Sequence, residues 1–115
     1  MSDQSVILVD LLRAHAGKQE EVLELLKLNT ESVIRTLPGW KTIRLIASGD
    51  GRGVAVYSEW ETPAAIEAMR ADARMKACFQ KIAALASLES LMGSRTSREA
   101  RRAWKPMTEE RQPWQ

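Results

Sequence analysis

One carboxylate stands in an otherwise aliphatic stretch, V-I-L-V-D-L-L-R over residues 6–13. This stretch is predicted to be a strand, because it is short and rich in β-branched and aliphatic side chains. Its Asp10 has the same parity as two leucines, so apolar side chains flank it on one face. Burial there would raise the pKa of Asp10 and make the carboxylate a base toward a phenol. The alternative is a structural role, in which Asp10 accepts hydrogen bonds from Arg44, Ser58 or the backbone and fixes the strand register.

Trp60 and His15 are the other side chains whose chemistry suits a site. Trp60 is interpreted either as a pocket wall that stacks on an aromatic ligand or as an ordinary core residue. His15, just past the predicted strand, could relay protons, since an unperturbed histidine titrates near ~6.5, or simply face solvent. Tyr57 has the opposite parity to Trp60, which favours a contact between subunits over chemistry. Cys78, next to Phe79, is interpreted as a small core residue, since no histidine lies near it in the pattern.

The composition argues against several classes of function. One histidine and one cysteine cannot form the usual metal shells of nitrogen and sulfur ligands, so no metal site is expected. The turn G-D-G-R-G over 49–53 is too short and wrongly placed to cradle a phosphate. The net charge is +2, but residues 94–115 hold six basic and three acidic side chains, which leaves −1 on the preceding part of the chain. This distribution argues against a nucleic-acid-binding face on the folded core.

The sequence also carries expectations about location. Its first residues lack the basic and long apolar regions of a secretory signal, and no run approaches the ~20 apolar residues that span a bilayer. A single cysteine cannot form an internal disulfide. A cytoplasmic protein that does not associate with a membrane is therefore expected.

The first half of the chain predicts a strand, a helix and a hairpin. After the strand at 6–13, apolar positions three and four residues apart predict a helix over 18–36. Pro38-Gly39 ends that helix. Two strand-like runs on either side of the glycine-rich turn at 49–53 then indicate a β-hairpin.

The second half is helical and then becomes ambiguous. Thr62 is a plausible N-cap followed by proline at the first helical position. A helical pattern continues over 64–88, and Asp72 marks a possible break and new start. Over 94–104 either a fourth strand or a polar helix fits. An extended or partly disordered tail is expected from residue 105 onward, because prolines and charges dominate there.

The resulting order, β-α-β-β-α-(β), is that of the α+β ferredoxin-like fold, a split βαβ arrangement with helices on one face of an antiparallel sheet. Since helices cover one side only, the other apolar face needs a partner, and a homodimer whose sheets pack face to face would supply it. The length of 115 residues predicts one domain. We expect the folded domain over 1–93 and a basic strand or arm and tail over 94–115.

Four short motifs occur in order at the spacing of a known family. They are L-P-G-W (37–40), S-G-D-G (48–51), V-Y-S-E-W-E-T-P-A-A (56–65) and A-D-A-R-M (71–75). In these motifs the chain resembles the antibiotic biosynthesis monooxygenase superfamily of dimeric α+β barrels, over about residues 5–93. The best-understood branch oxidises phenolic or anthrone-like rings to quinones with molecular oxygen and no flavin, haem or metal. The resemblance therefore implies a homodimer that acts on a small aromatic molecule and O₂ without a cofactor.

The residues of that branch transfer to this chain only in part. Its strand-three tryptophan matches Trp60. Its asparagine, tyrosine and arginine are replaced by Val56, Ile66 and Gln80. Three of the four polar contributors are therefore different here.

A haem-degrading branch fits less well, because Cys78 and Asp10 align with its iron-ligating histidine and its strand-one asparagine. In the family fold, the faces that carry Asp10 and Trp60 converge on a cavity between sheet and helices. The candidate catalytic residues are Asp10, His15 and Trp60, and the candidate substrate-binding residues are Leu8, Arg44, Val56, Ser58, Ile66, Met69, Phe79 and Gln80.

The leading hypothesis is cofactor-independent oxygenation of a small aromatic molecule, with Trp60 holding the ring and Asp10 or His15 managing the proton. The alternative is a non-oxidative protein on the same fold. In that case Asp10 serves an isomerase- or cyclase-type enzyme as a base, or the dimer only binds a ligand.

Overall fold

The computed structural model describes residues 5–94. The chain alternates strands and helices in the order that the sequence predicts, β-α-β-β-α-β with the second helical segment broken in two. The elements are β1 (Val6–Ala14), α1 (Gln19–Ser32), the short 3-10 helix η1 (Ile34–Thr36), β2 (Trp40–Ala47), β3 (Gly53–Trp60), α2 (Pro63–Ala71), α3 (Ala73–Ala83) and β4 (Ala86–Gly93).

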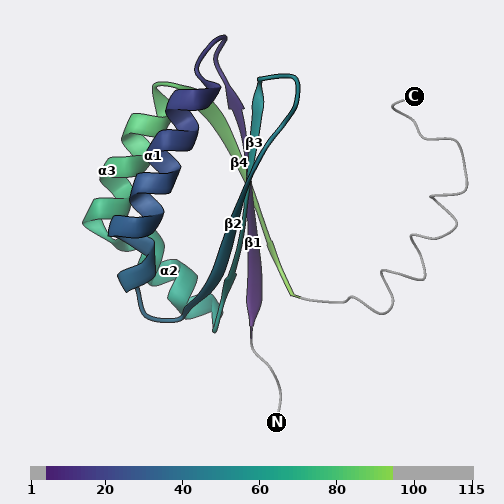
Figure 1. The fold of residues 1–115 in the computed structure, drawn as a ribbon. Helices are drawn as coiled ribbons and strands as arrows, with labels where there is room; N and C mark the ends of the chain where they lie inside the picture. The colour runs from purple at the N-terminus through teal and green to yellow at the C-terminus, as the bar shows by residue number, and fades with distance from the viewer. Residues whose placement is uncertain (1–4, 95–115) are drawn as a thin grey trace, which may run out of the picture.

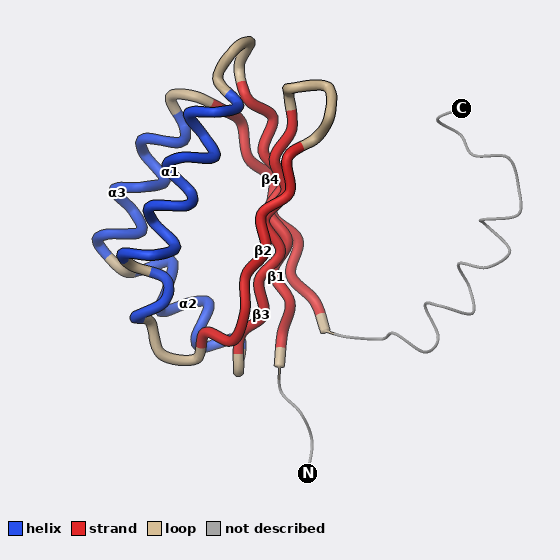
Figure 2. Tube along the Cα trace, viewed as in Figure 1, coloured by secondary structure: helices blue, strands red, loops and turns tan. Residues whose placement is uncertain are grey.

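The four strands form one antiparallel sheet in the order β2-β3-β1-β4. All the helices lie on one side of it, with α1 and α3 running along the sheet and α2 at one end (Figure 1). The tube view shows the same two layers, and no helix or strand within residues 5–94 lies on the opposite side of the sheet (Figure 2). The predicted ferredoxin-like fold is thus confirmed. We call the sheet face that the helices cover the inner face, and the opposite sheet face the outer face.

Side-chain alternation assigns each strand residue to a face. On β3, Val54, Val56, Ser58 and Trp60 are buried on the inner face, while the residues between them are only half-buried. On β1, Leu8 and Leu12 are buried in the same way, with Asp10 between them. The core divides into two clusters, one around Leu12 and one around Leu8. Asp10 therefore lies at the boundary between two apolar clusters.

The fourth strand is where the sequence-based prediction was wrong. The helical pattern expected to run to residue 88 ends at Ala83, and Ala86–Gly93 pair with β1 as β4. Leu88 and Leu91 stand three residues apart, which imitates a helical stripe. Pairing with the long apolar β1 overrides that local pattern. The strand that was one option over 94–104 lies outside the described residues, apart from Ser94.

The predicted helix boundaries hold elsewhere with small changes. The first helix ends at Ser32 and continues as η1, three residues of 3-10 helix. Thr62 caps α2, since its side chain accepts a hydrogen bond from the Ala65 backbone N–H. Asp72 ends α2 and caps α3 by accepting from two backbone N–H groups. None of the helices within residues 5–94 is both long and apolar enough to cross a membrane.

Candidate active site

Asp10 faces the helices from the middle of β1. It lies opposite Val56 on β3 and opposite Ser90 on β4. The Ser90 hydroxyl donates a hydrogen bond to Asp10 Oδ1. Burial raises the pKa of the Asp10 carboxyl, and the Ser90 hydrogen bond and the charge of Arg70 lower it by smaller amounts. The balance leaves the pKa of Asp10 above its ordinary value, as expected of a proton acceptor in an apolar site.

A narrow cavity lies directly beside this carboxylate, between the sheet and the helices. We call it the inner cavity; its volume is about 40 Å³, room for a few water molecules at most. Apolar side chains from β1, β3 and all three helices form most of its wall, including Leu8, Val56 and Phe79. The polar groups that reach it come from Asp10, Asn29, Thr30, Ser58 and the Trp60 ring.

A wider hollow opens from the same place toward the edge strand β4. This mouth groove has a volume of about 300 Å³ and is lined by Leu8, Asp10, Met69, Arg70, Phe79, Leu88 and Ser90. Five of these residues also line the inner cavity, so the two spaces share walls. A groove of this volume is at the lower end of the range for small-molecule sites. Together they form one candidate site, an open mouth above a narrow apolar slot.

Trp60 is a fixed wall of the inner cavity. Its side chain is 1% exposed, and its Nε1–H donates a hydrogen bond to Ser58 Oγ at 3.0 Å. Ser58 Oγ in turn lies 3.4 Å from the carbonyl oxygen of Leu8, to which it donates. The ring is thus held by β3 itself and braced against β1. This arrangement satisfies the one polar atom of the indole inside an apolar core.

Most of the predicted site residues come together here. Besides Asp10 and Trp60, the predicted residues that line the inner cavity are Leu8, Val56, Ser58, Met69 and Phe79. Ile66 is fully buried in the cluster around Trp60 but does not line either space.

Three predicted site residues lie elsewhere. His15 is exposed beyond the end of β1, five residues from Asp10, about 16 Å at the rise of an extended strand. Arg44 is exposed and lies opposite Tyr57, so it belongs to the outer face. Gln80 is exposed on α3, because the buried stripe of that helix runs through Met75, Cys78 and Ile82. Of the partners that the structural alternative named for Asp10, Arg44 lies on the other face and Ser58 bonds to Leu8, while Ser90 donates the hydrogen bond to Asp10.

These features agree with the comparison to known proteins. The family model for antibiotic biosynthesis monooxygenases matches residues 5–81 of this chain. The chain belongs to the antibiotic biosynthesis monooxygenase family. The match covers the elements from β1 to α2 and α3 as far as residue 81, and therefore all of the inner cavity except Ile82 and Leu88.

A curated relative within this family is tetracenomycin-F1 monooxygenase from Streptomyces glaucescens, which is 35% identical over 72 residues. The aligned region is 63% of this chain and 64% of that relative, so it spans less than two thirds of the relative's length.

Solved structures show the same family fold. SnoaB, a cofactor-independent oxygenase from Streptomyces nogalater, superposes with a TM-score of 0.75 at 17% identity, over 82% of this chain and 95% of its own. A monooxygenase from the ActVA-Orf6 gene of Streptomyces coelicolor, solved with the ligand nanaomycin D, gives a TM-score of 0.74 at 21% identity. That match covers 83% of this chain and 90% of the Streptomyces coelicolor chain. At these identities the likeness establishes the fold.

Sequence reasoning missed many lining residues of the site, among them Asn29, Thr30, Arg70, Leu88 and Ser90. Asn29 had a signal, because it sits among leucines and valines on the apolar stripe of α1. Its side chain is buried, and its Nδ2 donates to Met75 Sδ at 3.2 Å. Leu88 and Ser90 were hidden because their strand was interpreted as the end of a helix and the start of uncertain structure.

The described residues offer little to hold a metal ion. Within residues 5–94, histidine, cysteine and carboxylate side chains nowhere gather in a group of three or more that could bind one. Cys78 lines the inner cavity, and burial raises the pKa of its thiol more than the charge of Lys81 lowers it. The thiol therefore stays protonated at neutral pH and contributes apolar volume.

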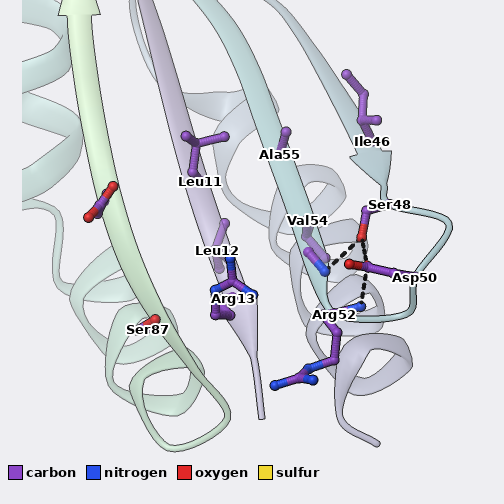
Figure 3. Close-up of a pocket in the computed structure, with 12 residues that line it drawn as sticks. Leu11, Leu12, Arg13, Ile46, Ser48, Asp50, Arg52, Val54, Ala55 and Ser87 are labelled. Atoms are coloured by element: carbon purple, nitrogen blue, oxygen red, sulfur yellow. Dashed lines mark hydrogen bonds between the residues drawn. The ribbon is translucent and has the colours of Figure 1, made fainter. Parts of the chain in front are cut away.

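A second hollow lies on the outer face, at the end of the sheet near the β2–β3 hairpin (Figure 3). Its volume is about 470 Å³, and Leu11, Ile46 and Ala55 contribute its apolar side chains. Ser48 and Asp50 at its rim bond within the turn, whereas the charged side chains of Arg13, Arg52 and Glu89 also line the hollow. The Arg52 backbone N–H donates to Asp50 Oδ1 at 2.9 Å, and the Gly53 N–H donates to Ser48 Oγ at 2.8 Å (Figure 3).

Proposed function

We propose that this protein is a cofactor-independent monooxygenase that oxidises a small phenolic or anthrone-like aromatic molecule with O₂. One observation carries the proposal: the Asp10 carboxylate reaches an apolar cavity beside the Trp60 ring, and no cation forms a salt bridge with it among residues 5–94. Such a carboxylate keeps its basicity, because burial disfavours its charged form and no ion pair restores it.

The chemistry requires only a base and a dry, aromatic-lined site. Ionised Asp10 takes a proton from the CH₂ group of an anthrone, which leaves a delocalised anion. This anion passes one electron to O₂, and the two radicals combine to form a carbon–oxygen bond. Loss of the second hydrogen with cleavage of the O–O bond gives the quinone carbonyl and water, so that CH₂ and O₂ become C=O and H₂O. The apolar walls exclude water from the anion.

The substrate is proposed to enter through the mouth groove. The inner cavity is too small for a ring system, so side chains between it and the groove must move aside. Met69 and Phe79 line both spaces, and methionine adapts easily because its side chain is unbranched and flexible. Trp60, which is held by Ser58, would remain in place as the surface on which the ring packs.

The relatives support this proposal over a non-oxidative role. The relative at 35% identity is a monooxygenase, and SnoaB is described as a cofactor-independent oxygenase. The alignment to the first spans 63% of this chain, and the superposition on SnoaB spans 82%.

Oxygen uptake with an anthrone tests the proposal. Protein treated with a chelator and free of flavin or haem absorbance should consume O₂ and form the quinone in equal amounts. Asp10→Asn should lower the rate by ~10²-fold or more, since a positioned base contributes ~10²–10⁴-fold. Glu31→Gln is the matched control, because Glu31 is an exposed carboxylate on α1. No oxygen uptake by the wild type above the protein-free rate, or equal uptake by Asp10→Asn, would refute the proposal.

The proposed enzyme is a homodimer that covers the outer face. Large apolar side chains are exposed there on three strands: Leu11 is 53% exposed, Ile46 55% and Leu91 69%. Their neighbours Val9, Ala55 and Tyr57 are only half-buried. Charged residues such as Arg44 and Glu89 also lie on this face, but its exposed apolar side chains need a cover, and a second copy offers a matching set.

Light scattering on the full chain tests the dimer. The wild type should have twice the mass of one chain, and Leu11→Glu should shift it toward a monomer. Leu28→Glu is the control, since Leu28 is 65% exposed on α1, away from the outer face. A monomeric wild type, or an unchanged dimer in Leu11→Glu, would argue against this interface.

A further inference from the structure

The mouth groove carries three polar side chains on an otherwise apolar wall. Asp10 comes from β1, Ser90 from β4 and Arg70 from α2, while the remaining lining residues are Leu8, Met69, Phe79 and Leu88. Asp10 and Ser90 already share a hydrogen bond. Arg70 is the one polar lining residue of the groove whose role the proposed chemistry has not used.

Arg70 is available to a ligand. Its side chain is exposed in the last turn of α2, and it forms no salt bridge within residues 5–94. The helix dipole by itself would explain a cation at the C-terminal end of a helix. Here, two further facts bear on its role: Arg70 lines the groove, and its charge is close enough to Asp10 to act on that carboxylate. The guanidinium thus presents its positive charge to the same space as the proposed base.

We propose that Arg70 stabilises the substrate anion at the mouth groove. This inference rests on the proposed function and assigns Arg70 a role in its reaction. Before proton transfer, the negative charge beside Arg70 is on Asp10; after it, the charge is on the substrate and Asp10 is neutral. Arg70 therefore faces one negative charge throughout, and the proton moves without separating charge in an apolar site.

Few other titratable groups face this site. β1 contributes Asp10, α2 contributes Arg70 and α3 contributes Cys78 to the inner cavity, whereas β3 and β4 contribute the hydroxyls of Ser58 and Ser90. α1 contributes Asn29 and Thr30, neither of which titrates. A change in the ionisation of a bound phenol can thus be traced to Asp10 or to Arg70.

A phenol that changes colour on ionisation provides the test. Alizarin, a dihydroxyanthraquinone, is already a quinone and does not need oxygen to report its charge. The full-length protein is kept in saturating excess over the dye at low ionic strength, and the pH is varied. The pKa of the bound dye is read from its visible absorbance. Arg70→Gln should raise that pKa by about one pH unit relative to wild type, since one nearby charge shifts a pKa by ~1–3 units and solvent weakens an exposed one. Arg70→Lys should retain most of the effect, and added salt should reduce it.

Two controls separate this effect from others. Lys76→Gln removes the same charge from an exposed position on α3 that lines neither space, and should leave the bound dye unchanged. Asp10→Asn should move the dye pKa in the opposite direction, downward. An equal dye pKa in Arg70→Gln and wild type, or failure of the wild type to bind the dye at millimolar concentration, would overturn the inference. A clear Arg70 effect in a protein that consumes no O₂ would keep this anion site and refute only the oxygenation.

Discussion

Ser90 on β4 donates a hydrogen bond from its hydroxyl to the carboxylate of Asp10 on β1, and the two residues face each other directly across the strand pair. This contact joins residues 80 positions apart in the chain. It gives the proposed base a fixed orientation, with one oxygen bound to Ser90 and the carboxylate at the boundary of the mouth groove and the inner cavity.

Removing that hydroxyl should make Asp10 more difficult to ionise. The Ser90 hydrogen bond lowers the pKa of Asp10 and so opposes the larger effect of burial, and Ser90→Ala leaves burial unopposed apart from Arg70. We expect the Asp10 pKa, followed by NMR of its carboxyl carbon, to rise. The rate of any reaction that needs ionised Asp10 should then reach its half-maximum at a higher pH. Ser87→Ala is the control, because Ser87 faces outward on the same strand opposite Arg13; an equal shift there would contradict the explanation.

Asp10 should also make the folded state less stable as the pH rises. Its pKa lies above the ordinary 3.8 in the folded protein, chiefly because of burial, so the folded state binds its proton more tightly than the unfolded state. The Asp10 contribution to the free energy of unfolding is therefore unaffected well below 3.8 and falls as the pH rises from there through the folded pKa. The asparagine of Asp10→Asn does not titrate. The free energy of unfolding of this variant in urea, relative to that of the wild type, should therefore increase across this window and then level off. A constant difference from acid to neutral pH would count against a raised pKa.

The hydrogen bond between Trp60 and Ser58 should be measurable as a coupling. Ser58→Ala leaves the buried Nε1–H without its acceptor and should cost ~1–3 kcal/mol. Trp60→Phe removes the donor and part of the ring, with a cost of a similar order. Because the second change removes the group that the first leaves unsatisfied, the double variant should be less destabilised than the sum by ~1 kcal/mol. If the losses in unfolding free energy of the two single variants add up in the double variant, as measured by chemical denaturation, the contact does not stabilise the wall of the cavity.

Gly39 allows α2 to pack beneath the loop that precedes β2. Its φ is +83°, and a Cβ added there would lie 2.6 Å from the Cβ of Ala65. Gly17 has a similar φ of +77°, but an added Cβ would meet nothing within 4 Å. Gly17→Ala should therefore cost about 1–2 kcal/mol from backbone strain alone, and Gly39→Ala should cost roughly 1–3 kcal/mol more from overpacking. Equal losses in thermal or urea unfolding would show that the approach of α2 is adjustable.

The sequence by itself determined the local structure and the face on which each β1 and β3 side chain lies. Strand alternation has a period of two, so a single strand assignment places Asp10 with Leu8 and Leu12, and Trp60 with Val56. Capping is equally local, because Thr62 and Asp72 bond to backbone groups within three residues. Two of the four family motifs, over 56–65 and 71–75, lie in these segments, which helped the fold to be predicted.

Only the tertiary structure decided what surrounds the carboxylate. Leu88 and Ser90 belong to a segment whose local pattern looks helical, and it becomes β4 because β1 offers an unpaired edge far away in the chain. Arg70 reaches the groove through the packing of α2 against the sheet, while Arg44 is turned outward by its register with Tyr57. Strand pairing and helix packing join distant residues, so no local period reports them. The partner of Asp10 and the cation of the site were therefore visible only in the folded chain.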